Sequence, residues 1–130
     1  MRVFLKYHRN ALIWAFLIFV LCTMPVSGVE PFKLLNLFSF DKIIHMVLFA
    51  FQFWFLVIGI IKQRTFSYKR NRSARLAFII TSIYGAVIEL IQGYVVNRNM
   101  DPMDMLANTI GAGIGWLMYY YFKRKVKPSS

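Results

Sequence analysis

Four long apolar segments make up most of this chain, and they constrain its fold more than any other feature. About 20 helical residues cross a hydrocarbon core of roughly 30 Å, because each residue of an α-helix advances the chain by about 1.5 Å. The second, third and fourth segments have this length, whereas the first is shorter unless its flanking residues extend it. The sequence therefore predicts four transmembrane helices, at about residues 10–25, 42–61, 75–96 and 104–122.

The composition supports a membrane protein. The chain is 58% hydrophobic and 18% aromatic, which is more apolar surface than a soluble domain of 130 residues could bury. Its formal net charge of +11 could suggest nucleic acid, but the positive residues form short clusters between apolar segments and follow no basic stripe. We expect a single all-α integral membrane domain over residues 1–130, with the lipid bilayer and not nucleic acid as its partner.

The positions of lysine and arginine predict the orientation. If all four segments span, 13 of the 16 Lys and Arg residues lie on one side, in the N-terminal segment, the loop between the second and third helices, and the C-terminal segment. The positive-inside rule then places both termini in the cytoplasm. Residues 1–28 also resemble a signal peptide, whose cleavage would leave three helices. The single cysteine, Cys22, can form no intrachain disulfide, and we interpret it as an apolar filler.

Polar side chains gather at the opposite, outer end of the predicted bundle. Residues three or four apart share one helix face, and three such pairs occur within about two turns of an outer helix end. We expect nothing comparable in the inner third, where the only charges are those of Lys and Arg residues in the loops. The outer polar layer consists of Asp41 and His45, Glu89 and Gln92, Asp104 and Asn108, and Arg98 in the loop between the last two helices.

Some members of this layer have simpler explanations. Asp101 precedes Pro102, a pattern typical of a helix N-cap followed by proline at the first helical position. Asp104 would then lie in the first turn, where the helix dipole favours an acidic group. Glu89 has no such explanation, because it lies inside an apolar segment where an ionisable group costs a few kcal/mol unless it is partnered or hydrated. We therefore interpret Glu89 as functional.

Small residues predict close helix packing. Ala107, Gly111 and Gly115 recur every four residues on the fourth helix, a spacing that lets another helix approach closely. Gly85 precedes Glu89 by one turn on the third helix. We expect a tight contact between the third and fourth helices that brings Glu89 toward Asp104 and Asn108. The competing use of the small-residue stripe is a homodimer.

Taken together, "FDKIIHMVLFA" and "YGAVIELIQGYVVNRNMDPMDMLANTIGAGIG" resemble the VanZ-like family of small bacterial membrane proteins. The resemblance covers roughly residues 41–116 and implies a multi-pass protein of the bacterial cytoplasmic membrane. It also implies a role in the cell envelope, since the family is named after a protein associated with resistance to the glycopeptide teicoplanin. The matching positions are Asp41, Lys42, His45, Glu89, Gln92, Arg98, Asp104, Asn108 and Gly111.

Three functions are compatible with this pattern. The first is an outward-facing site that binds a lipid-linked envelope precursor or a glycopeptide, with Lys42, Gln92, Arg98 and Asn108 as binding residues. The second is a membrane-embedded enzyme acting on an envelope lipid, and the third is a scaffold whose polar layer fixes helix register. The sequence contains no compact metal motif, so we predict no metal site, although an enzyme could use a divalent cation; any cofactor is left open. The candidate catalytic residues are Asp41, His45, Glu89 and Asp104.

Overall fold

The computed structural model describes residues 1–24, 37–63, 70–95 and 100–122, with the side chains of residues 37–41 and 70 left out of the description. This part of the chain forms four α-helices and contains no strand, as the sequence predicted. The helices are α1 (Arg2–Thr23), α2 (Leu37–Lys62), α3 (Arg70–Tyr94) and α4 (Pro102–Phe122).

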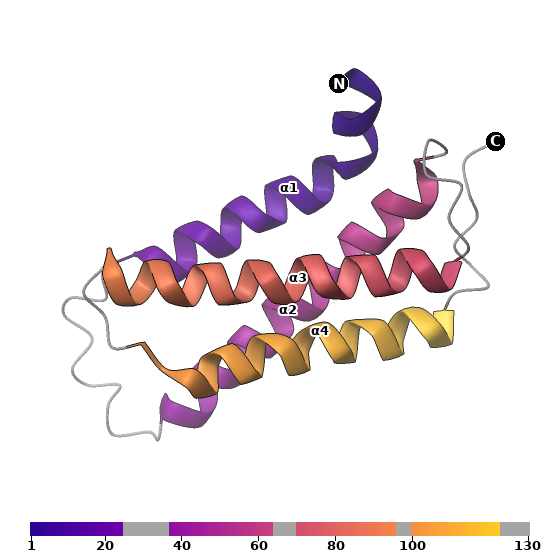
Figure 1. Cartoon of the computed structure of the whole chain (residues 1–130). Helices are drawn as coiled ribbons and strands as arrows, with labels where there is room; N and C mark the ends of the chain where they lie inside the picture. Colours follow the sequence, from indigo (N-terminus) through magenta and orange to yellow (C-terminus); the bar gives the residue numbers. More distant parts are fainter. Residues whose placement is uncertain (25–36, 64–69, 96–99, 123–130) are drawn as a thin grey trace.

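Consecutive helices run in opposite directions (Figure 1). The start of α1 and the end of α4 therefore lie toward the same end of the bundle. We call this the basic end, where α2 ends at Lys62 and α3 begins at Arg70, and we call the other the acidic end, where α3 ends at Tyr94 and α4 begins at Pro102. Helix α2 contacts all three other helices, whereas α1 and α4 do not touch in the described residues. Helix α2 is therefore the centre of the bundle.

Three helix starts differ from the predicted bounds. Helices α1, α2 and α3 each begin five to eight residues before the expected residues 10, 42 and 75. The apolar stretches mark only the part of a helix that suits hydrocarbon. Arginine and lysine are good helix formers, so α1 and α3 continue through them beyond the apolar stretch, whereas α2 extends backwards through the largely apolar residues 37–41. Helix α4 begins as expected at its proline, and the backbone N–H of Met103 donates to Asp101 Oδ1 at 2.8 Å, which confirms Asp101 as the N-cap.

Three helical segments of the described chain are long and apolar enough to cross a membrane: Arg2–Thr23, Lys42–Lys62 and Asn71–Tyr94. Helix α4 is not among them, because Asp104, Asn108 and a run of tyrosines lower its hydropathy. The outward-facing surfaces of the helices carry large apolar side chains such as Phe16, Ile83 and Leu117, which are 59–72% exposed. Such surfaces suit lipid far better than water.

The glycines of α4 pack on α2, which corrects the expected partner. A Cβ on Gly111 would lie 2.4 Å from the carbonyl oxygen of Met46, and one on Gly115 would lie 2.6 Å from that of Ala50. Both neighbours belong to α2 and not to α3. The helix with the small-residue stripe thus approaches the central helix at backbone distance, and this stripe is covered within the chain.

Side-chain hydrogen bonds to main-chain carbonyl oxygens hold helix α1 against α2 and α3. Trp14 of α1 donates its indole N–H to the carbonyl of Leu48 on α2 at 2.9 Å. In return, the Tyr84 hydroxyl donates to the carbonyl of Ala15 at 2.5 Å, and Gln92 donates to that of Cys22 at 2.7 Å. Cys22 itself is 4% exposed and packs in a small core. Helix α1 is therefore an integral part of the packed bundle.

Candidate functional site

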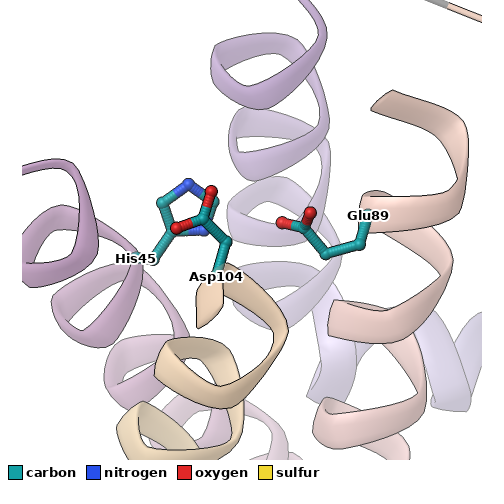
Figure 2. Close-up of side chains that lie close together, drawn as sticks. All are labelled: His45, Glu89 and Asp104. Carbon is teal, nitrogen blue, oxygen red and sulfur yellow. The ribbon is translucent and has the colours of Figure 1, made fainter. Parts of the chain in front are cut away.

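Three ionisable side chains from three different helices meet at the acidic end. Figure 2 shows His45 of α2, Glu89 of α3 and Asp104 of α4 pointing toward one another. One potential ligand atom of each lies within 4.8 Å of the others. Glu89 is 1% exposed and His45 is 4% exposed, while the side chain of Asp104 is 14% exposed. The three therefore form a buried polar cluster with Asp104 as its most accessible member.

The helix positions explain why these residues meet. Asp104 lies in the first turn of α4, one turn before Asn108, and Glu89 lies five residues before the end of α3, about 8 Å from that end. Gly85 lies one turn before Glu89 and allows α3 and α4 to approach closely, because a Cβ there would lie 2.9 Å from Cβ of Asn108. The predicted contact between α3 and α4 is thus present at Gly85, although Gly111 and Gly115 of α4 face α2.

Asn108 orients the imidazole of His45. The Nδ1 atom of His45 lies 2.8 Å from Oδ1 of Asn108, and both side chains are buried. A carbonyl oxygen can only accept a hydrogen bond, so Nδ1 of His45 is the donor to Asn108. The site therefore contains a histidine whose ring orientation is fixed by Asn108, with the other ring nitrogen on the far side of the ring.

Lys42 links the cluster to the N-cap of α4. Its Nζ lies 3.0 Å from Oδ2 of Asp101 and 3.0 Å from Oδ1 of Asp104. The backbone N–H of Met103, followed by the Lys42 ammonium, lowers the pKa of Asp101 below its ordinary value. The sequence indicated only a capping role for Asp101, and its second role as a partner of Lys42 was missed because the two residues are 59 positions apart.

The cluster has the chemistry of a cation site, with one qualification. An imidazole nitrogen and two carboxylates are ligands that divalent transition metals accept, and the spacing of His45, Glu89 and Asp104 would permit shared coordination. However, the Lys42 ammonium already lies against the Asp104 carboxylate and would compete with a second cation there. The sequence predicted no metal site, and that expectation stays a prediction.

The remaining predicted site residues are distributed differently. Gln92 is buried, and its amide nitrogen binds the α1 backbone, so this hydrogen bond gives the side chain a role in packing α1 on α3. Arg98 lies outside the described residues, as does the side chain of Asp41. Their assignment to the site remains a prediction.

The structure also places polar side chains where none was expected. Near the basic end, His8 Nε2 lies 2.7 Å from Oε1 of Gln63, and both residues are buried. Gln52 and Thr81 are buried closer to the middle of the bundle. From the sequence, no buried polar group comparable to the outer layer was expected at this end, and the pair of His8 and Gln63 was therefore missed. No spacing rule links His8 to Gln63, because the pair joins segments 55 residues apart.

Comparison with known proteins places the chain in a family. The model of the VanZ/LLP1 family matches residues 5–123, so the chain belongs to this family, as the resemblance indicated. It is also similar to the uncharacterized protein C11E3.10 of Schizosaccharomyces pombe, with 25% identity over 89 residues. That match covers 67% of this chain and about half of the relative, 51% of its length. No solved structure matches.

Proposed function

We propose that this VanZ/LLP1 protein binds a cell-envelope ligand through the acidic-end cluster of His45, Glu89 and Asp104. The observation that carries this proposal is that the buried His45 and Glu89 meet the partly buried Asp104 where three helices of a membrane protein converge. Such groups are costly in apolar surroundings and typically mark a binding site or a reaction centre. A merely structural pairing would not need contributions from three helices.

The proposed topology has four spans, with the acidic end outside and both termini in the cytoplasm of a bacterial cell. Helix α4 has 21 residues and a length of roughly 31 Å, and it lies alongside α3 as a full-length member of the bundle (Figure 1). The Lys and Arg clusters of the N-terminal segment, the α2–α3 loop and the C-terminal segment then share the basic end. Because α1 is packed into the bundle, we also propose that it is retained and not removed as a signal peptide.

The chemistry of the cluster narrows the proposed ligand. Carboxylate oxygens accept hydrogen bonds, while the Lys42 ammonium is already held between two aspartates. A ligand rich in hydroxyl and amide N–H donors therefore suits the site better than one recognised by its phosphate alone. Lipid-linked wall precursors and lipid-bearing glycopeptides offer such donors, and altered teicoplanin susceptibility would be one consequence of binding.

Native mass spectrometry of the detergent-purified protein tests this proposal. A lipid-linked envelope precursor is expected to co-purify with, or bind to, the wild type, and to be lost from Glu89→Gln and Asp104→Asn while both variants remain folded. Gly113→Ala is the matched control, because its added methyl meets nothing within 4 Å. If the two site variants are less stable but bind the same species as wild type, the cluster is a scaffold and the proposal is wrong.

A second candidate is a membrane-embedded enzyme acting on an envelope lipid. The hydrogen bond from His45 to Asn108 favours it, because it fixes the orientation of the imidazole ring, as a general acid or base requires. Turnover of the lipid that is abolished in His45→Gln without loss of binding would establish catalysis. Binding without turnover would support the first proposal, a binding site without catalysis.

A further inference from the structure

A cavity of about 360 Å³ lies between α1, α2 and α3, on different side chains from the acidic-end cluster. Its lining extends from Phe4 to Ala15 on α1, from Gln52 to Ile60 on α2 and from Leu76 to Tyr84 on α3. These stretches correspond to about 12–16 Å along the helix axes. The cavity is therefore an elongated slot that reaches from near the basic end into the middle of the bundle.

The walls of the slot suit a hydrocarbon chain. They consist mainly of aliphatic and aromatic side chains from the three helices. Leu12 and Ile80 line the slot and are also 42–45% exposed on the outside of the bundle, which is its lipid-facing surface. An apolar molecule can thus reach the slot sideways from the bilayer, without passing through water.

Three buried polar side chains also line the slot: His8, Gln52 and Thr81. The ring of His8 has its Nε2 atom on Gln63 and its Nδ1 atom against Gly59 of α2, which leaves Gln52 and Thr81 to be considered. Thr81 is 0% exposed and Gln52 is 6% exposed. Neither the Thr81 hydroxyl nor Gln52 Oε1 has a hydrogen-bond partner in the part of the chain that the structure describes. Buried polar atoms are almost always satisfied, because leaving one unsatisfied costs about 1–3 kcal/mol. These two atoms therefore point to a ligand that supplies the missing partners.

Their chemistry favours a group that both donates and accepts a hydrogen bond. Gln52 Oε1 can only accept a hydrogen bond, whereas the Thr81 hydroxyl can donate one. A hydroxyl group satisfies both, since it donates to the glutamine and accepts from the threonine. A carboxylate or an ester accepts only and would place an oxygen against Gln52 Oε1. An alkane satisfies neither atom.

We propose that this slot binds an aliphatic alcohol, with its hydroxyl between Gln52 and Thr81 and its chain along the apolar walls. The Tyr84 hydroxyl does not compete for this role, because it is engaged with the carbonyl of Ala15. Gln52 lies ten residues before the end of α2, so the bound hydroxyl lies roughly 15 Å from the basic end. This binding does not depend on the function proposed for the acidic end.

Photolabelling of the full chain in lipid nanodiscs tests this inference. The probe is an octanol that carries a diazirine, and its adducts are mapped by mass spectrometry. Adducts are expected on the slot-lining parts of α1, α2 and α3. They should be competed by 1-octanol but not by 1-methoxyheptane, which has a similar size and no hydrogen-bond donor. Equal competition by the two molecules, or no adducts in the slot, overturns the proposal.

Two variants and one control sharpen the test. Thr81→Val and Gln52→Leu are each expected to lower labelling of the slot about five- to tenfold, as the loss of one hydrogen bond predicts. Thr109→Val is the control, because that hydroxyl donates within α4 to the carbonyl of Met105 at 3.1 Å. Labelling that is unchanged in both slot variants refutes the hydroxyl-specific site. If either variant fails to fold, competition by 1-octanol and by 1-methoxyheptane on the wild type still decides whether the slot requires a hydroxyl group.

Discussion

Replacing Gly111 with alanine tests the closest helix contact in the bundle. The added Cβ would lie 2.4 Å from the carbonyl oxygen of Met46 and 2.8 Å from its Cα, both atoms of the α2 backbone. Contacts under 3.0 Å are essentially never found for real Cβ atoms, so α2 and α4 must separate by at least about 0.6 Å. A backbone cannot rotate away as a side chain does. We therefore expect a cost at the upper end of the overpacking range, about 3 kcal/mol.

Gly113→Ala supplies the reference for this prediction. It makes the same chemical change two residues later on the same helix, where a Cβ meets nothing within 4 Å. Any gain in helix propensity, up to about 1 kcal/mol, is common to both variants and cancels in their difference. The free energies of unfolding of the two variants should therefore differ by about 3 kcal/mol, with Gly111→Ala the less stable.

Reversible unfolding in mixed micelles, followed by far-ultraviolet circular dichroism, measures this difference. Gly115→Ala, whose Cβ would lie 2.6 Å from the carbonyl oxygen of Ala50, should behave like Gly111→Ala. Equal stability of the Gly111 and Gly113 variants would show that α2 and α4 do not approach at backbone distance. The packing described for the small-residue stripe would then be refuted.

Three further predictions concern the polar contacts. Lys42→Met should lower the free energy of unfolding at neutral pH by about 1–3 kcal/mol, because Asp101 and Asp104 lose a charged donor; an unchanged unfolding curve would contradict this. The pKa of Asp101 is lowered in the folded state, so the ionised carboxylate stabilises the fold above its ordinary pKa of 3.8. This contribution is lost as the pH falls through the lower pKa of the folded state. A pH titration of the free energy of unfolding should therefore show a component that Asp101→Asn removes. Gln92→Met should cost about 1 kcal/mol and increase hydrogen exchange in the adjacent part of α1, whereas unaltered exchange would show that the bond to the Cys22 carbonyl does not fasten that helix.

Sequence patterns predicted the parts of this structure that have a local cause. The four helices follow from length and apolar content, and the Asp101 cap follows from the adjacent Pro102. The meeting of His45, Glu89 and Asp104 followed from their similar depth in a bundle of alternating helices. Depth is set by the number of residues along each helix, so the amino-acid sequence alone is enough to compare the depths of two side chains.

The relations that escaped prediction depend on how each helix is rotated about its own axis. Small residues at 107, 111 and 115 indicate that some helix comes close, but they do not say which, and the structure puts α2 there. For the same reason, Gln92 shares a face with Glu89 by spacing alone, yet its amide bonds to α1. Thr81 and Gln52 gave no signal, since a single hydroxyl or amide in an apolar helix is unremarkable until its surroundings are known.

The fastening of α1 through carbonyl oxygens has a consequence for the order of biogenesis. During synthesis α1 emerges first, but Tyr84 follows Ala15 by 69 residues, and Gln92 follows Cys22 by 70. At about 5–20 residues per second, roughly 3–14 s pass before these donors are even made. During that interval α1 can already pack on α2, since Trp14 precedes its acceptor Leu48 by only 34 residues and α1 contacts α2 more extensively than α3. Helix α1 can therefore join the bundle in two steps, first on α2 and later on α3.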